Sequence, residues 1–298
     1  RKKIGDVYNL NPENIICGNG SDELFFLITN TFANENKEVL FSKYGFLIYE
    51  IAAKASGAKP VIAKEKNLRA DVNFILNKAS TKTSVCFIAN PNNPTGTYLS
   101  KDEIIRLRNN LPKSCVLVID AAYSEYVENE DYNDGLELAL NREDTIVTHT
   151  FSKIHGLPSL RLGWAYCPKK IANHINKIRP AFNINAFAQE LAIDALEDKN
   201  FIKKSIRHNN KWKKWLEESI LSLGLEINTS VANFVLIKFE NSRVASNCAN
   251  FLESRNILVR TLEDYKLSEY LRITIGLANE NKILIKNLEY FINKTKGV

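Results

Sequence analysis

The sequence contains no methionine among its 298 residues and only four histidines. Its apolar runs are no longer than a strand and no secretory signal opens it, so it predicts neither a membrane span nor export. The five cysteines are scattered without CxxC spacing, which predicts reduced thiols and excludes a disulfide framework or a metal site. Internal repeats and low-complexity tracts are also absent. These absences favour a cytoplasmic globular protein with no membrane partner and no metal.

The composition is typical of a globular chain, with 45% hydrophobic and 25% charged residues. The net charge of +6 raises the question of nucleic acid, but the basic residues are spread along the chain. The nearest basic and aromatic patch, KWKKW (211–215), has its tryptophans at helical spacing, which predicts a half-buried helix with a solvated lysine face. We therefore expect no nucleic-acid partner, and the positive charge would instead steer phosphorylated and dicarboxylate substrates.

Apolar strand-like runs alternate with helical stretches through the first half of the chain. This alternation predicts an α/β fold with a mostly parallel sheet covered by helices, and the length predicts two domains, residues 1–200 and a smaller α+β domain over 201–298. The expected strands are 15–17, 39–41, 61–63, 85–89, 116–119, 145–147, 233–239, 257–259 and 271–275. The expected helices are 45–56, 72–77, 101–109, a long region from 186 to 223, 242–255 and 279–293.

The most informative stretch is FSK (151–153), followed eight residues later by Arg161 in LRLGW (160–164). A lysine whose surroundings favour the neutral amine forms Schiff bases with carbonyl compounds. Pyridoxal phosphate is such a compound, and its phosphate suits a forked cation such as Arg161 and a small donor such as Ser152. Taken alone, a Ser-Lys pair near an arginine is more typical of a solvated surface, so the hypothesis depends on further motifs.

The first further motif is DAAY (120–123), which directly follows the apolar, β-branched run 115–119. That run predicts a buried parallel strand, so Asp120 is expected at a carboxyl strand end, where ligands bind in open α/β sheets. A carboxylate there can hold the pyridinium nitrogen of the cofactor protonated, and Tyr123 can reach the phenolic oxygen of the ring. The alternative is that Asp120 only caps a following helix.

The second further motif, NPNNPTG (90–96), follows another strand-like run. Its two prolines and glycine predict a rigid turn at a strand end. Asn93, held between the prolines, could donate its side-chain amide to the ring oxygen. A plain connection would need neither this many asparagines nor this order.

The third further motif is GNGSDE (18–23), which lies between a strand-like run and a helical run. A glycine turn that opens a helix makes an anion site from backbone N–H groups and the helix dipole. The motif matches neither the dinucleotide-binding nor the P-loop fingerprint. The alternative is an ordinary helix start with Ser21 as N-cap, and both can hold together.

These motifs, in this order, resemble those of the fold-type I aminotransferases of classes I and II, and most closely the histidinol-phosphate branch of that family. The resemblance covers nearly the whole chain. NPNNPTG together with SK and RLGW is specific to the superfamily, and the remaining motifs favour the histidinol-phosphate branch. The motifs that carry it are GNGSDE (18–23), YGFLIY (44–49), NPNNPTG (90–96), DAAY (120–123), TFSKIHGLPSLRLGW (150–164), FNINAFAQ (182–189) and LRITIG (271–276).

The resemblance implies a role for each matching residue. Lys153 carries pyridoxal 5'-phosphate and shuttles the proton, which leaves the neighbouring His155 a structural role. Arg272 would bind the carboxylate of the amino-acid partner and Arg260 the substrate phosphate, unless these arginines only pair with Glu263, Asp264 or Glu269. The other cofactor contacts are Asp120 on the pyridinium nitrogen, Asn93 and Tyr123 on the ring oxygen, Tyr44 stacked on the ring, and Ser152, Arg161 and the amides of Ser21 and Asp22 on the phosphate.

The implied activity is amino transfer between histidinol phosphate and 2-oxoglutarate, in histidine biosynthesis, by a homodimer. Family members also carry residues before the position of Arg1, including a tyrosine that enters the neighbouring subunit's site, and these cannot be assigned in this sequence. An aromatic or broad-specificity aminotransferase and a phosphoamino-acid decarboxylase are the alternatives with the same fold. A cofactor-binding regulator fused to a DNA-binding domain is the alternative of another class, but no helix-turn-helix precedes the motifs in this sequence.

Overall fold

The computed structural model describes residues 1–296, which divide into two compact units. The large unit comprises Arg1–Asn93 and Tyr98–Lys203, and the small unit comprises Pro94–Thr97 and the chain from Lys204 onward. The segment NPNNPTG therefore contributes to both units. Within residues 1–296, no helix has both the length and the apolar character that a membrane span requires.

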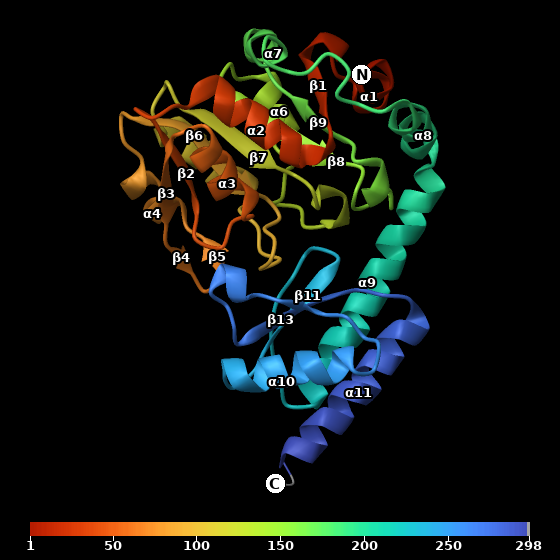
Figure 1. Cartoon of the computed structure of the whole chain (residues 1–298). Helices are drawn as coiled ribbons and strands as arrows, with labels where there is room; N and C mark the ends of the chain where they lie inside the picture. The colour runs from red at the N-terminus through yellow and green to blue at the C-terminus, as the bar shows by residue number, and fades with distance from the viewer. Residues whose placement is uncertain (297–298) are drawn as a thin grey trace. The chain divides into compact units, whose positions relative to one another are not determined.

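The large unit is built on a seven-stranded sheet with the order β1-β9-β8-β7-β6-β2-β3 (Figure 1). Strands β3, β2, β6, β7 and β8 run parallel, whereas β9 is antiparallel to both β8 and β1. The mostly parallel sheet predicted from the alternation is thus confirmed, and β9 is a strand that the periodicity missed. The strands are β1 Ile15–Gly18, β2 Glu38–Ser42, β3 Lys59–Ala63, β6 Thr83–Ala89, β7 Val116–Asp120, β8 Thr145–Thr150 and β9 Gly163–Tyr166, with a separate hairpin of β4 Glu65–Lys66 and β5 Arg69–Ala70.

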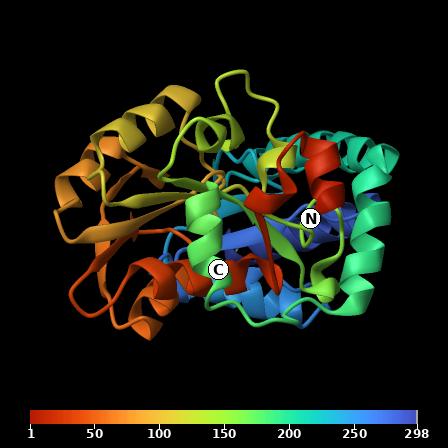
Figure 2. The same cartoon turned by 90° about the horizontal axis from the view of Figure 1, so that it is seen from above.

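Helices cover both faces of this sheet, as the view in Figure 2 shows. One buried apolar cluster joins the sheet to α2, α3 and α7, and a second joins its other face to α1, α4, α5, α6 and α8. Parallel strands buried on both faces explain the almost continuous apolar runs in the sequence. The helices are α1 Lys2–Tyr8, α2 Gly20–Phe32, α3 Ile48–Ala55, α4 Val72–Lys78, α5 Lys101–Asn110, α6 Leu136–Leu140, α7 Lys169–Asn176 and α8 Ala186–Glu197.

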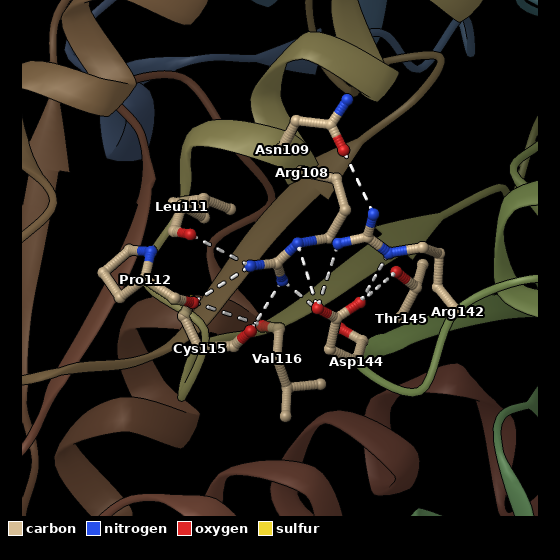
Figure 3. Close-up of polar contacts among 9 residues, drawn as sticks. All are labelled: Arg108, Asn109, Leu111, Pro112, Cys115, Val116, Arg142, Asp144 and Thr145. Carbon is tan, nitrogen blue, oxygen red and sulfur yellow. Dashed lines mark hydrogen bonds and ion pairs between the residues drawn. The ribbon is translucent and has the colours of Figure 1, made fainter.

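A buried arginine ties together the amino ends of β7 and β8 (Figure 3). The side chain of Arg108, on α5, is 1% exposed and lies 3.5 Å from the carboxylate of Asp144. Its guanidinium also donates to the carbonyl oxygens of Cys115 at 2.6 Å and Pro112 at 3.0 Å. The fork of N–H donors thus binds the carbonyls that precede the strands, which offsets the cost of burying the charge.

The small unit contains a four-stranded antiparallel sheet with the order β10-β11-β13-β12. An apolar cluster from α9, α10 and α11 packs on it, which confirms the predicted α+β composition of this part of the chain. The strands are β10 Glu226–Asn228, β11 Phe234–Lys238, β12 Arg260–Thr261 and β13 Tyr270–Thr274. The helices are α10 Ser242–Glu253, α11 Ala278–Lys296 and α9 Lys199–Ser222, of which residues 199–203 belong to the large unit.

Two predicted elements of the C-terminal half are wrong in detail. The strand expected at 257–259 is irregular, and the paired residues are Arg260 and Thr261. The long helical region is divided at Asp198, which ends α8 and accepts a hydrogen bond from the Phe201 amide at 2.8 Å, as a cap of α9. The tryptophan-lysine stretch of α9 is half-buried as predicted, with Leu216 buried and Lys214 exposed.

Candidate active site

The centre of the candidate site is Asp120, the last residue of β7. Its carboxylate is buried and accepts hydrogen bonds from the Tyr49 hydroxyl at 2.7 Å and the Ala122 amide at 3.2 Å. Burial raises the pKa of Asp120 to about 6, although both hydrogen bonds act in the opposite direction. Only a 3-10 turn beginning at Ser124 follows, so Asp120 caps no α-helix. A carboxylate held in this way is suited to a cationic partner at the strand end.

Lys153 follows the neighbouring strand β8, in a short loop. Its Nζ lies 5.2 Å from the centroid of the buried Tyr123 ring, and its positive charge is among the influences that lower the pKa of Asp120. Ser152 is anchored through its backbone amide, which donates to the Thr150 hydroxyl at 3.1 Å. The ends of β7 and β8 thus bring a primary amine, a phenol and a carboxylate into one neighbourhood.

The start of α2 lies against Arg161. The guanidinium of Arg161 donates to the Asp22 carboxylate at 3.2 Å, and the Gly20 amide donates to the Arg161 carbonyl at 3.0 Å. Gly20 has a φ of +78°, a conformation that favours glycine, and a Cβ there would lie 2.5 Å from Arg161 Nη2, so another residue would strain the backbone and displace the guanidinium. A helix N-terminus with an adjacent guanidinium forms an anion site.

The helix start itself differs from one prediction. Helix α2 begins at Gly20 with Asn19 at the N-cap position, so the assignment of Ser21 as N-cap is wrong. The Glu23 carboxylate accepts a hydrogen bond from the Asn19 amide at 2.6 Å and another from the Asn183 side chain at 2.7 Å. The backbone amides of Ser21 and Asp22 lie in the first turn of α2, where N–H groups have no partner within the helix and can bind an anion.

The loops that carry Tyr44 and Asn93 are linked by Asn92, the residue next to Asn93 in NPNNPTG. The Asn92 side-chain amide donates to the Tyr44 carbonyl at 3.0 Å. The Tyr44 amide donates to the Glu65 carboxylate at 3.0 Å, and its hydroxyl accepts from Lys43 at 2.9 Å. Both Tyr44 and Asn93 are half-buried. These hydrogen bonds fix the loop that bears Tyr44 next to the loop that bears Asn93.

Arg260 and Arg272 belong to the small unit, where they are direct cross-strand partners in β12 and β13. Arg260 pairs with Asp264 at 3.3 Å in an exposed ion pair, which is the alternative considered for this residue, and the Arg272 guanidinium lies 5.0 Å from the Phe234 ring centroid. Like charges directly opposite each other destabilise a sheet, and the Asp264 carboxylate offsets part of this repulsion on the Arg260 side.

Tyr49 is a contact of Asp120 that the sequence reasoning did not assign, although it closes the quoted motif YGFLIY. The available signal was an aromatic residue on the apolar face of the helix expected at 45–56. A cavity of about 560 Å³ lies elsewhere: its lining includes Ile16, Cys17 and Phe182 and none of the predicted site residues.

The residues present in the large unit fit pyridoxal phosphate. The buried Asp120 carboxylate would face the ring nitrogen, and the Tyr123 hydroxyl and Asn93 amide are donors suited to the ring oxygen. The Gly20 approach builds an anion cradle from Arg161 and the first turn of α2. Each group matches the charge or polarity of one part of the cofactor.

Known proteins resemble this chain in sequence and in fold. The family model described as aminotransferase class I and II matches residues 1–288. The histidinol-phosphate aminotransferase of Maricaulis maris is 46% identical over 98% of this chain and 81% of its own, and that of Rhodopseudomonas palustris strain TIE-1 is 44% identical over 99% and 81%. The crystal structure of the Sinorhizobium meliloti histidinol-phosphate aminotransferase with pyridoxal-5'-phosphate superposes with a TM-score of 0.93 at 24% identity, covering 99% of this chain and 80% of that one. This chain belongs to the class I and II aminotransferase family, on the fold-type I architecture.

Proposed function

We propose that this protein is a pyridoxal-phosphate enzyme that transfers the amino group of L-histidinol phosphate to 2-oxoglutarate, in histidine biosynthesis. The products are imidazole acetol phosphate and glutamate. The observation that carries the proposal is the 46% identity to a histidinol-phosphate aminotransferase over 98% of the chain. The site residues described above supply the chemistry that this reaction needs.

The cofactor, when bound, supplies an aldehyde that accepts the amino group and a ring that accepts electrons. The chain's own residues would bind and orient the cofactor and transfer the proton. Lys153 would hold the cofactor and move the proton at the α-carbon of the substrate, and Asp120 would keep the ring nitrogen charged. Asn93 and Tyr123 would bind the ring oxygen and Tyr44 would cover the ring. Ser152, Arg161 and the amides of Ser21 and Asp22 would bind the phosphate.

We assign the anionic groups of both substrates to Arg260 and Arg272. Histidinol phosphate brings a phosphate and no α-carboxylate, whereas glutamate brings two carboxylates, so one pocket must accept different anions in turn. Two guanidiniums on facing residues of β12 and β13 suit this task, because each is permanently charged and binds oxyanions through two N–H groups. Arg272 would bind the carboxylate and Arg260 the phosphate, in exchange for its exposed pairing with Asp264.

Substrate choice tests this assignment. Arg272→Ala should lower kcat/KM in the half-reaction of glutamate and 2-oxoglutarate by about tenfold or more, the equivalent of one lost charge-assisted contact. Arg260→Ala should weaken the binding of histidinol phosphate more than the binding of unphosphorylated histidinol. The control is Arg243→Ala, which removes an exposed arginine from α10 of the same unit. The measurement is the cofactor absorbance change on mixing each amino donor with the wild-type and variant enzymes.

Two outcomes would contradict the proposal. Faster turnover of phenylalanine or tyrosine than of histidinol phosphate, with Arg260→Ala affecting both alike, would favour a broad-specificity aminotransferase. Release of carbon dioxide from a phosphorylated amino acid would favour a decarboxylase, an activity named for a structural neighbour from Porphyromonas gingivalis that superposes with a TM-score of 0.83 at 24% identity.

We also propose that the protein acts as a homodimer. Phe182 and Phe187 are 98% and 78% exposed, and Phe182 lines the cavity of about 560 Å³. Apolar patches of this kind on globular proteins mark association surfaces. Sedimentation analysis should give twice the chain mass, and Phe182→Asp with Phe187→Asp should shift the equilibrium towards monomer. A monomeric wild-type protein at micromolar concentration would refute this proposal.

We place the protein in the cytoplasm. The support is that Cys17, Cys86, Cys115, Cys167 and Cys248 are all free thiols, four of them buried. Unpaired cysteines in this number are typical of a reducing compartment.

A further inference from the structure

Tyr49 connects the packing of α3 to the carboxylate of Asp120. Its side chain is fully buried, and its hydroxyl donates to Asp120 Oδ2 at 2.7 Å. The ring is stacked on Phe87 of β6, with centroids 4.6 Å apart and an angle of 3°, and it meets the Phe25 ring edge-on at 5.2 Å. These aromatic contacts hold the phenol so that its hydroxyl is fixed on one oxygen of the carboxylate.

The carboxylate is thus held by two donors of different kinds. The Ala122 amide donates to Oδ1 at 3.2 Å, and its position is set by the turn after β7. The Tyr49 hydroxyl on Oδ2 is closer, and it comes from a side chain that can be changed without altering the backbone. A hydrogen bond to an ionised carboxylate favours the charged form over the neutral acid.

Other charged groups near Asp120 act in both directions. Burial raises the pKa of Asp120 to about 6, the Tyr49 and Ala122 hydrogen bonds and the charge of Lys153 lower it, and the charge of Asp22 on α2 raises it. Tyr132 is also within electrostatic reach, and the charge of Asp120 helps to raise the pKa of that phenol. Tyr49 is the side chain among these that donates a hydrogen bond directly to the carboxylate.

We propose that Tyr49 is a positioning residue for cofactor binding, whose hydroxyl keeps Asp120 ionised and fixed in the orientation that pairs with the ring nitrogen. The proposal rests on the pyridoxal-phosphate site proposed above. It assigns to Tyr49 no contact with substrate or cofactor, because its effect is transmitted through Asp120. The competing explanation is that Tyr49 only fills space between α2, α3 and the sheet.

Binding of two cofactor forms separates these explanations. Tyr49→Phe removes one oxygen and leaves the ring contacts with Phe25 and Phe87 in place. The apo protein is titrated with pyridoxal phosphate and with its carbocyclic analogue, in which a C–H group replaces the ring nitrogen. Tyr49→Phe should weaken the binding of pyridoxal phosphate about tenfold, as expected for the loss of one hydrogen bond to a charged group. The affinity for the analogue should stay unchanged or improve. An equal loss of affinity for both ligands would show a packing role and overturn the proposal.

The matched control is Tyr166→Phe, on β9. Its side chain is also buried, but its hydroxyl accepts a weak hydrogen bond from the Asn14 side-chain amide at 3.4 Å in place of donating to a carboxylate. This variant undergoes the same chemical change in the same unit, so it should bind both ligands as the wild type does. A selective loss of pyridoxal phosphate affinity in Tyr166→Phe would remove the assignment to Tyr49.

The pH dependence of apo-protein stability gives a readout independent of the cofactor. Because the folded-state pKa of Asp120 lies above its value of 3.8 in the unfolded chain, ionisation of Asp120 destabilises the fold as pH rises from about 4 through about 6. Loss of the Tyr49 hydroxyl raises that pKa further. The unfolding midpoint of Tyr49→Phe should therefore lie further below that of the wild type at pH 8 than at pH 5. The Tyr166→Phe deficit should not depend on pH.

A Tyr49→Phe deficit that is the same at pH 5 and pH 8 would overturn the proposal. Failure of the proposed substrate assignment would look different: the wild-type enzyme would bind pyridoxal phosphate more tightly than the analogue but would not transfer the amino group of histidinol phosphate. The role of Tyr49 and the substrate of the enzyme are thus tested by separate observations.

Discussion

Replacing Lys153 with alanine is expected to reduce turnover by about 10⁴-fold or more. The amine would lose two functions at once, because the same nitrogen holds the cofactor and moves the proton during amino transfer. Proton transfer by a positioned side chain alone contributes up to about 10⁴-fold. The fold should be little affected, because the Lys153 side chain is half-buried and its Nζ lies over the Tyr123 ring without a close ion pair.

Borohydride reduction of the cofactor-loaded protein, followed by peptide mass spectrometry, provides the direct check. The wild type should carry the cofactor covalently on Lys153, and Lys153→Ala should remain unlabelled. Lys78→Ala, an exposed lysine at the end of α4, is the control and should be labelled like the wild type. Labelling of another lysine in the wild type, or full activity of Lys153→Ala, would exclude this lysine as the cofactor anchor.

The sequence predicted the large sheet well because parallel strands buried on both faces are continuous apolar runs. Val116–Asp120 and Thr83–Ala89 are nearly all buried, and both were recognised from composition. Strand β9, Gly163–Tyr166, was missed because it has four residues and begins inside the functional motif LRLGW (160–164). Its position in the sheet depends on antiparallel pairing with β1, a contact between residues about 150 positions apart that local periodicity cannot reveal.

The small sheet was predicted less accurately at its edge. The apolar run 257–259 is more strand-like than Arg260 and Thr261, but the pairing with β13 falls on the latter two residues. Register is set by contacts across the sheet, and here it makes Arg260 the direct neighbour of Arg272. The sequence identified both arginines, but only the pairing shows that they are side by side.

The same limit applies to the candidate site. Lys153, Asp120 and Arg161 lie in motifs where residue type and strand ends point to cofactor chemistry. Tyr49 lies 71 positions before Asp120 and on a different element, so its hydrogen bond depends on the packing of α3 against β7 and β6. Supporting residues of this kind are determined by tertiary structure, whereas the residues they support follow strand ends that can be recognised locally.

Replacing Asp120 with alanine is expected to lower turnover by about 10²–10³-fold, the range found when one preorganised electrostatic contact is removed. The ring nitrogen would lose its counter-charge where the electrons of the reaction accumulate. Asp120→Glu should retain some activity, because the charge is kept but displaced. Asp120→Asn keeps the size and an acceptor for the Tyr49 hydroxyl, so it isolates the effect of the charge.

Stability should change in the opposite direction, and this distinguishes a functional carboxylate from a structural one. The pKa of about 6 means that the apo fold disfavours ionised Asp120, since the unfolded-state value is 3.8. Asp120→Asn should therefore stabilise the apo protein above pH 6 by up to about 3 kcal/mol and by little at pH 4. Urea unfolding at both pH values measures the difference. A variant that keeps near-normal turnover with cofactor bound, or one that is less stable than the wild type at pH 8, would show that Asp120 serves the fold and not the cofactor.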